Sequence, residues 1–566
     1  MDKTWLKFYH NEVPAEISFE KITLSDALVQ TAQRFADKPA LLFQGTTISF
    51  RELDNLVSRF ASALVALGVQ PGDKVALLMP NLVQMVVATY GAFRAGAVVV
   101  MNNPLYTDRE LGHQYNDSDS KFLVSLDLLV PRMINLRQKT GIRKIVSCHI
   151  RDFLPFPLKQ IFPFVKKRMH LKTPAATDVF EFMDLLKKHG PMSDPPKLEW
   201  DDTAVLLYTG GTTGVSKGVE LTHANLSCNV QQCGSWFPDF ELGGEILVGC
   251  LPFFHSFGMT AAMNIGIYYG WADVLIPKPE PKPILDAIDK YKATFIPAVP
   301  TLYNGMINFP GLKKYSLKSL KGCFSGGAPL PMETLKDFEK LTGAQICEGY
   351  GLTEASPVTH VNPYGAKTKP GTIGVPIPNT DAKLVELDDF NKEITTPGEP
   401  GELCLKGPQV MKAYINCPDE TAIALRDGWL LTGDIATVDE EGYFSIVDRK
   451  KDLIISGGFN IYPRDVDEVL FEHPKVLEAC AIGVPDQYSG ERIKAYVVLK
   501  EGETATALEI IDYCRENLVK YKVPKYVAFV KELPKSEVGK ILRKELRFID
   551  QARAKKAQES SSRGQS

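Results

Sequence analysis

The sequence has no two cysteines in a Cys-x-x-Cys arrangement, although ten cysteines are scattered along its 566 residues. It therefore shows neither the paired spacing of a zinc finger nor that of a thioredoxin-like redox centre. A chain of this length also needs no disulfide framework for stability, because it can bury a large core. We therefore expect reduced thiols in a cytoplasmic protein.

A strong excess of one charge and a long unbroken apolar run are also missing. The formal net charge is −3, which gives no indication of nucleic-acid binding. The most apolar window, residues 83–101, is interrupted by Gly91, Arg94 and Gly96. It therefore predicts a helix, a turn and a buried strand rather than a membrane span. The first residues contain no apolar segment of the signal-peptide type, which also favours a cytoplasmic location.

The composition that is present, with 44% hydrophobic and 23% charged residues, is that of a globular protein. Up to about residue 380, short apolar runs alternate with helical patterns, which predicts an α/β fold with parallel sheets. From residue 381, short strands with Pro and Gly turns predict a β-rich subdomain. The charged run 448–452 looks like a solvated connector to a smaller α+β domain. We expect a large N-terminal domain (1–447), a hinge (448–451), a small mobile C-terminal domain (452–550) and a disordered tail (551–566).

The most informative motif is the loop 208–218, which is rich in glycine and threonine and contains Lys217. It follows an apolar run, 204–207, that predicts a buried strand. Glycines let the backbone approach a ligand closely, and successive N–H groups, hydroxyls and a lysine can hold phosphate oxygens. The loop is not a Walker A motif, because Gly218 and not Ser or Thr follows the lysine. It predicts a nucleoside triphosphate site; a hairpin without a ligand is the alternative.

Three further motifs carry groups that suit a nucleotide. Residues 349–354 combine glycines with an aromatic ring, a hydroxyl and a carboxylate, which can contact a base, a phosphate and Mg²⁺. Asp434 follows Thr-Gly and can accept hydrogen bonds from ribose hydroxyls. Lys540 lies in a glycine-containing loop near the C-terminus. Taken singly, these motifs also fit a capped turn, an Asp turn and a solvated lysine.

Together and in this order, the four motifs resemble those of the adenylate-forming superfamily, which includes acyl-CoA synthetases, firefly luciferase and peptide-synthetase adenylation domains. The resemblance extends from about residue 23 to residue 546. Within the superfamily the chain is most similar to bacterial long-chain fatty-acid–CoA ligases, which it resembles at residues 103–107, 251–258 and 448–463. The resemblance implies that a carboxylate attacks the α-phosphate of ATP to give an acyl-adenylate and pyrophosphate. CoA then displaces AMP to give a thioester.

The resemblance also assigns roles to residues. Thr209 and Glu354 are the expected Mg²⁺ ligands, and Asp434 and Arg449 are expected to hold the ribose. Gly327, Ala328, Gly349 and Tyr350 are expected to frame the adenine. The other residues assigned to ATP are Gly210, Gly211, Thr212, Thr213, Gly214, Lys217, Gly351 and Thr353.

Four residues are expected to carry the catalysis: Lys540, Glu354, Thr209 and His255. Lys540 is expected to reach the incoming carboxylate and the α-phosphate. Lys451 corresponds to the family's hinge, about which the small domain is expected to rotate between the two half-reactions. The expected CoA contacts are Ser456, Gly457 and Gly458. The expected acyl-pocket residues are His255, Met259, Val299 and Gly326.

The four segments expected to line the acyl pocket, 233–236, 259–267, 298–303 and 325–327, contain no charged residue. This favours an apolar acyl tail. A medium-chain or 4-coumarate-like aryl acid is the enzymatic alternative, because such ligases share every ATP-site residue. A non-catalytic fatty-acid-binding or trafficking protein is the alternative from another class, since fold alone does not establish activity.

Residues 153–177 contain no acidic residue and interleave apolar with basic side chains. Such a segment can lie in an anionic membrane interface, so peripheral membrane contact through residues 153–172 is one interpretation. A flap over the protein's own core or a homodimer contact is the other. The three prolines of the segment, Pro155, Pro157 and Pro163, argue against a regular helix.

Overall fold

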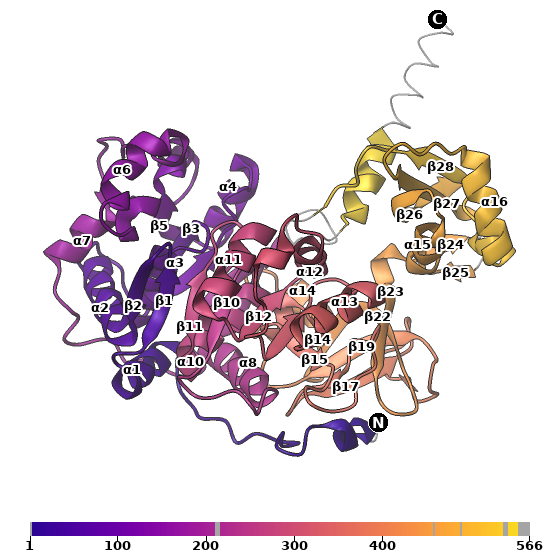
Figure 1. Ribbon diagram of the computed structural model, residues 1–566, viewed down its shortest axis with the longest axis horizontal. Coiled ribbons are helices and arrows are strands. Elements are labelled where there is room, and N and C mark those ends of the chain that lie inside the picture. The colour runs from indigo at the N-terminus through magenta and orange to yellow at the C-terminus, as the bar shows by residue number, and fades with distance from the viewer. Residues whose placement is uncertain (1–2, 210–215, 457–458, 487–488, 536–540, 553–566) are drawn as a thin grey trace, which may run out of the picture. The chain divides into compact units, whose positions relative to one another are not determined.

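The computed structural model describes residues 3–209, 216–456, 459–486, 489–535 and 541–552 (Figure 1). Its internal contacts divide the chain into two compact units. The large unit contains residues 2–382 and 405–431. The small unit contains residues 383–404 and the chain from residue 432 onward. Mixed α/β sheets with helices between their strands confirm the α/β class predicted from the sequence.

The first sheet of the large unit has eight strands in the order β20-β9-β8-β4-β3-β5-β6-β7. Strands β8, β4, β3, β5, β6 and β7 run parallel to one another, whereas β9 and β20 add antiparallel pairs at one edge. The bounds are β3 Lys74–Leu78, β4 Val98–Met101, β5 Ser120–Leu126, β6 Lys144–Cys148, β7 Val179–Glu181, β8 Thr203–Thr209, β9 Lys217–Thr222 and β20 Ala413–Tyr414.

The second sheet of the large unit has nine strands in the order β16-β15-β14-β13-β12-β10-β11-β1-β2. Strands β10 to β14 are parallel, as their crossover helices require. The bounds are β1 Pro39–Phe43, β2 Thr46–Ser49, β10 Ile246–Gly249, β11 Ala272–Leu275, β12 Phe295–Ala298, β13 Gly322–Ser325, β14 Gln345–Gly351, β15 Val358–Val361 and β16 Val375–Pro376.

Helices connect these strands and begin where the sequence supplies capping groups. Ser49 and Glu52 form a capping box at α2, and Thr107 and Glu110 form another at α4, so the first backbone N–H groups are satisfied. The helices of the large unit include α1 Leu24–Arg34, α2 Phe50–Ala66, α3 Val83–Arg94, α4 Asp108–Asp117, α5 Val130–Leu136, α7 Phe182–Lys188, α8 His223–Ser235, α11 Pro281–Tyr291, α12 Pro300–Ile307 and α13 Met332–Thr342.

Helix α3 explains the apolar window found in the sequence. Every one of its residues is buried, so the window is apolar because the helix is enclosed by protein on all sides. Its one charge, on Arg94, is satisfied by Asp54, whose Oδ1 lies 2.7 Å from Nη2. Within the described ranges, no helix has both the length and the apolar character that crossing a bilayer requires.

The small unit contains β-rich structure followed by an α+β region. Its sheet of β24 to β28 packs with α15 and α16 around an apolar core that includes Ile454, Val466 and Ile510. The bounds are β23 Phe444–Arg449, β24 Ile454–Ser456, β25 Phe459–Ile461, β26 Val476–Asp486, β27 Gly490–Leu499, β28 Tyr526–Phe529, α15 Pro463–Glu472 and α16 Ala507–Asn517. Two strands, β19 Gly401–Lys406 and β22 Trp429–Val438, have residues in both units.

The charged run 448–452 is solvated only in part. Lys450 and Lys451 are exposed, as the sequence suggested, whereas Asp448 and Asp452 are buried. Asp448 accepts a hydrogen bond from the backbone N–H of Arg464 at 2.8 Å, and Asp452 pairs with Arg547 at 2.6 Å. The expectation was wrong for these two aspartates because their partners lie too far along the chain to be recognised from a local charge pattern.

The expectation of no regular helix between residues 153 and 177 was also wrong. Helix α6 spans Leu158–Val165 and contains Pro163. Pro157 immediately precedes it, where the fixed φ of proline suits a helix start. Pro163 removes one N–H donor, which would otherwise bond to the carbonyl of Lys159. The helix ends two residues later, so the lost bond interrupts little structure.

All ten cysteines lie within the described ranges and are free. Nine are buried, and Cys417, which precedes α14 (Pro418–Ala424), is partly exposed. Burial raises the pKa of the Cys250 thiol to about 12. The buried thiols therefore act as small apolar groups of the core.

Candidate active site

The glycine-rich loop joins two neighbouring antiparallel strands. Thr209 at the end of β8 lies opposite Lys217 at the start of β9, so both residues stand at the same end of the hairpin. The Nζ of Lys217 donates to Oε2 of Glu420 at 2.7 Å and lies 4.4 Å from the ring centroid of Tyr414. Gly210, Gly211, Thr212, Thr213 and Gly214 lie outside the described residues.

Tyr414 links the loop lysine to the second motif. Its hydroxyl donates to Oε1 of Glu354 at 2.8 Å, while its ring contacts Lys217. Burial, reinforced by the Glu354 carboxylate, raises the pKa of the tyrosine well above its usual value, so it remains a donor. The backbone N–H of Met411 also bonds to the carbonyl of Glu354 at 2.8 Å. No local sequence pattern marks Tyr414, because only the pairing of β20 with β9 brings it here.

The backbone around residues 349–354 requires its glycines. A Cβ on Gly349 would lie 2.3 Å from the ring of Phe324, and one on Gly351 would lie 2.1 Å from the carbonyl oxygen of Pro357. Gly349 and Tyr350 continue β14 and pair with β15, and the Tyr350 ring lies 6.0 Å from that of His360. This tight packing fixes the course of the chain that leads to Thr353 and Glu354.

The structure brings the histidine motif to the same region. Ser256 Oγ lies 3.4 Å from Thr353 Oγ1, and Thr260 Oγ1 donates to the carbonyl of Ser356 at 2.6 Å. His255 is exposed, and its Nδ1 accepts the backbone N–H of Phe257 at 3.3 Å. The motif is therefore joined to the Thr353–Glu354 segment by side-chain hydrogen bonds.

The residues expected to line the acyl pocket follow neighbouring parallel strands. Val299 comes after β12 and Gly326 after β13, and these two strands pair directly. A Cβ on Gly326 would lie 3.1 Å from the ring of Phe257, so this glycine adjoins the histidine motif. Met259 begins a π-helical turn and is buried. Gly327, which is expected to frame the adenine with Ala328, has a φ of +83°, which favours glycine.

Two further expected residues pair with each other within the small unit. Asp434 and Arg449 lie opposite each other on β22 and β23, and Arg449 Nε lies 3.3 Å from Asp434 Oδ1. Lys451 is exposed in the turn that follows, and Ser456 ends β24. Gly457, Gly458 and Lys540, which are also expected to act in the site, lie outside the described ranges.

Comparison with protein families matches two models to this chain. The model described as "AMP-binding enzyme" covers residues 28–415, and the model described as "AMP-binding enzyme C-terminal domain" covers residues 465–540. The chain belongs to the family of AMP-binding enzymes. The first match contains the glycine-rich loop, Glu354 and Tyr414, and the second ends at Lys540.

This AMP-binding enzyme is similar to curated relatives over nearly its whole length. It is 45% identical to a long-chain-fatty-acid–CoA ligase of Bacillus subtilis, with 96% of this chain and 97% of the relative covered. It is 42% identical to a protein of the same name from Escherichia coli O6:H1, with 98% and 99% covered.

Solved structures show the same fold. ATP-bound MatB from Rhodopseudomonas palustris matches with a TM-score of 0.80 and 29% identity, covering 93% of this chain and 99% of MatB. The anthranilate CoA ligase AuaEII, in complex with anthranoyl-AMP, matches with a TM-score of 0.81 and 26% identity, covering 94% and 98%. The two structures therefore contain ATP and anthranoyl-AMP, respectively.

Proposed function

We propose that this AMP-binding enzyme converts a long-chain fatty acid, ATP and CoA into acyl-CoA, AMP and pyrophosphate through an acyl-adenylate. The observation that carries this proposal is the identity of 42–45% to long-chain-fatty-acid–CoA ligases over at least 96% of the chain. The Lys217–Tyr414–Glu354 cluster in the expected nucleotide site supports it, because a protein that only binds fatty acids has no need of groups suited to a triphosphate and Mg²⁺.

In the first half-reaction, a carboxylate oxygen of the fatty acid attacks the α-phosphorus of ATP and pyrophosphate leaves. In the second, the CoA thiolate attacks the acyl carbonyl carbon and AMP leaves. The protein contributes by positioning the reactants and by offsetting negative charge as it develops. Lys540 is proposed to supply the positive charge beside the α-phosphate.

Thr209 and Lys217 are proposed to hold the β- and γ-phosphates at the mouth of the β8–β9 hairpin. Lys217 is only 14% exposed and already bonds to Glu420, so phosphate oxygens must compete with this carboxylate for the ammonium group. The ion pair with Glu420 is therefore proposed to lower the affinity for the nucleotide. Asp434 and Arg449, which are paired in the small unit, are proposed to hold the ribose hydroxyls.

The residues proposed for Mg²⁺ fit its chemistry. A threonine hydroxyl and a glutamate carboxylate are hard oxygen ligands. The Tyr414 hydroxyl binds one oxygen of Glu354, which orients the carboxylate and leaves its second oxygen for the ion. When bound, Mg²⁺ supplies positive charge to the phosphates.

An apolar acyl site is proposed around His255, Met259, Val299 and Gly326. Gly326 and Val299 come from paired strands, and the buried side chain of Met259 adds a flexible apolar surface. His255, exposed beside this surface, is proposed to shape the entrance from the CoA side. Ser456, Gly457 and Gly458 are proposed to contact CoA after a rotation about Lys451.

Contact with an anionic membrane is proposed for residues 153–172. Apolar side chains on and around α6 are exposed, with Phe156 at 83% and Phe164 at 75%, and neighbouring lysines such as Lys166 and Lys167 are exposed as well. This combination suits a headgroup interface, from which a membrane-dissolved fatty acid could be taken up. Co-sedimentation with anionic but not zwitterionic vesicles is expected, and a Phe156→Ser, Phe164→Ser variant should lose it. A homodimer through this surface would appear as a mass change instead.

The decisive experiment measures AMP and pyrophosphate release with ATP, Mg²⁺ and CoA across acetate, octanoate, palmitate, oleate and 4-coumarate. We expect palmitate or oleate to be preferred, with the thioester as product. Preference for octanoate or 4-coumarate would keep the chemistry and change the substrate. Fatty-acid binding without AMP formation would favour a binding or trafficking protein and refute the proposal.

A further inference from the structure

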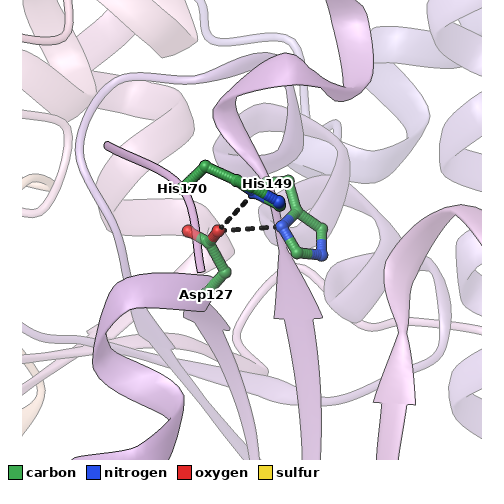
Figure 2. A group of neighbouring side chains, drawn as sticks. All are labelled: Asp127, His149 and His170. Atoms are coloured by element: carbon green, nitrogen blue, oxygen red, sulfur yellow. Dashed lines mark hydrogen bonds and ion pairs between the residues drawn. The ribbon is translucent and has the colours of Figure 1, made fainter. Parts of the chain in front are cut away.

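A cluster of side chains that can bind a metal lies at the carboxyl-terminal ends of strands in the eight-stranded sheet (Figure 2). The proposed reaction does not use these residues. Asp127 follows β5 and His149 follows β6, and these parallel strands are neighbours. The third member, His170, comes from the chain after α6. Because the carboxyl ends of parallel strands meet at one sheet edge, the fold brings Asp127 and His149 together.

The three candidate ligand atoms converge. Asp127 Oδ2 lies 2.8 Å from Nδ1 of His149 and 3.2 Å from Nδ1 of His170, and all three atoms lie within 4.8 Å of one another. Asp127 is fully buried and His149 nearly so. Two ligands that each lie about 2.0–2.2 Å from one Zn²⁺ ion in a tetrahedral site are about 3.3–3.6 Å apart. The 3.2 Å pair is close to this separation, and the 2.8 Å pair must lengthen by about 0.5 Å to admit the ion.

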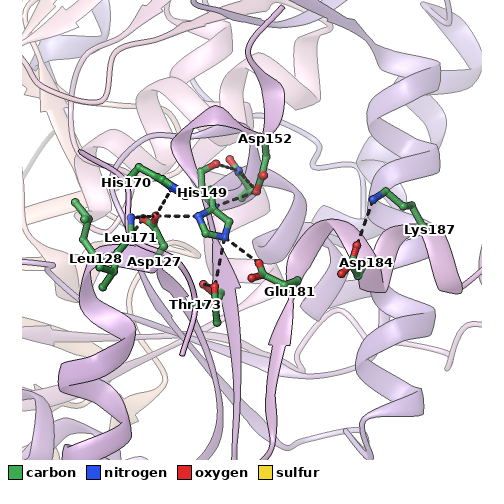
Figure 3. A network of polar contacts seen from close by, with 12 residues as sticks. Asp127, Leu128, His149, Asp152, His170, Leu171, Thr173, Glu181, Asp184 and Lys187 are labelled. Atoms are coloured by element: carbon green, nitrogen blue, oxygen red, sulfur yellow. Dashed lines mark hydrogen bonds and ion pairs between the residues drawn. The ribbon is translucent and has the colours of Figure 1, made fainter. Parts of the chain in front are cut away.

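The surrounding groups have the arrangement that holds metal ligands in place (Figure 3). The other ring nitrogen of His149, Nε2, lies 2.9 Å from Oε2 of Glu181, and a ligating histidine commonly donates its second N–H to such a carboxylate. Asp127 accepts the backbone N–H groups of Leu128 at 2.9 Å and Leu171 at 2.8 Å. Both ligands are therefore oriented by partners outside the cluster.

A charged imidazole is the competing explanation for part of this geometry. Burial opposes a charge on His149, but its bonds to Asp127 and Glu181 outweigh burial and raise its pKa to about 9. That ion pair does not explain His170. Its Nδ1 is buried and makes no hydrogen bond, although it stands 3.2 Å from the Asp127 carboxylate. A cation between the three atoms satisfies this nitrogen as well.

We propose that Asp127, His149 and His170 bind a divalent transition-metal ion, with Zn²⁺ the best match to two imidazole nitrogens and one carboxylate oxygen. The site is structural. It fastens the chain after α6 to the sheet, since His170, Leu171 and Thr173 all contact Asp127, His149 or the neighbouring Ser147. Metal binding would thus hold the end of the exposed segment 153–172 against the sheet.

The test uses the full-length protein, stripped with a chelator, dialysed and then titrated with Zn²⁺ or Co²⁺. We expect one ion per chain by elemental analysis and a rise in Tm on adding Zn²⁺, because a ligand of the native state stabilises it. Bound Co²⁺ should show the visible bands of a tetrahedral nitrogen–oxygen site without the near-ultraviolet band of a thiolate ligand. These readouts are independent of the proposed ligase activity.

Variants assign the ion to the cluster. His170→Gln should abolish stoichiometric binding, and Glu181→Ala should weaken Zn²⁺ affinity by about 10- to 100-fold. His189→Gln, a histidine of the same unit outside the cluster, should bind as the unaltered protein does. His170 and Glu181 are partly exposed, so these variants should fold even if an Asp127 variant does not. No stoichiometric binding by the unaltered protein, or equal binding by it and His170→Gln, would overturn the proposal.

Discussion

Replacing Tyr414 with phenylalanine removes one hydroxyl and keeps the ring beside Lys217. The hydroxyl donates to the Glu354 carboxylate at 2.8 Å in a largely buried setting. A hydrogen bond to a charged group contributes about 1.5–3 kcal/mol. If that bond holds Glu354 in the geometry needed for Mg²⁺–ATP, its loss lowers the kcat/KM of adenylation by about 10- to 150-fold.

The measurement is fatty-acid-dependent exchange between pyrophosphate and ATP, run over a range of Mg²⁺ concentrations. We expect Tyr414→Phe to need more Mg²⁺ and to recover part of the lost rate when Mg²⁺ is raised. Thioester formation from preformed acyl-adenylate should change little, because pyrophosphate and its metal have already left.

A matched control is Tyr115→Phe, which removes a buried tyrosine hydroxyl of the same unit whose partner is the sulfur of Met133. It should leave exchange within about twofold, since a weak bond remote from the site is lost. If Tyr414→Phe also stays within twofold at every Mg²⁺ concentration, the role assigned to the Tyr414–Glu354 bond is wrong.

Four further predictions concern single residues. Glu420→Gln should lower the KM for ATP by about 1.4- to fivefold, because a partly exposed ion pair worth about 0.2–1 kcal/mol no longer competes for Lys217; an unchanged or higher KM would contradict this. Lys540→Ala should slow adenylation by about 10²–10³-fold while sparing thioester formation from acyl-adenylate, and equal loss in both half-reactions would refute its assignment. Lys451→Pro should slow the thioester step more than adenylation, which separate assays of the two steps will decide. Burial lowers the pKa of His223 to about 4, so the unfolded chain binds more protons between about pH 6.5 and 4. Stability should therefore fall by about 3 kcal/mol as the pH drops through that window, and denaturant unfolding of His223→Gln should show a smaller fall.

The strands of the parallel sheets were predictable, because few folds other than parallel α/β sheets accommodate short apolar runs that alternate with helical patterns. The apolar run 204–207 lies within β8, and the buried strand expected in the window 83–101 is β4. Positions where the backbone is crowded, such as Gly349 and Gly351, were also visible as local motifs. In each case the information lies in consecutive residues.

What the sequence did not reveal depends on contacts between distant segments. Tyr414 reaches Glu354 only because β20 pairs with β9, and no local pattern around residue 414 announces that pairing. Asp127, His149 and His170 are brought together by strand order and by the path of the chain after α6. The burial of Asp448 likewise depends on a backbone N–H sixteen positions away.

The distribution of cysteines makes this chain unusually convenient for site-selective labelling. Because nine thiols are enclosed in the interior, a maleimide dye added to the native protein should couple first to Cys417. That residue immediately precedes α14, the helix that carries Glu420, the partner of Lys217. A fluorophore placed there, without any engineering of the sequence, could report in real time when a triphosphate displaces Glu420 from the lysine.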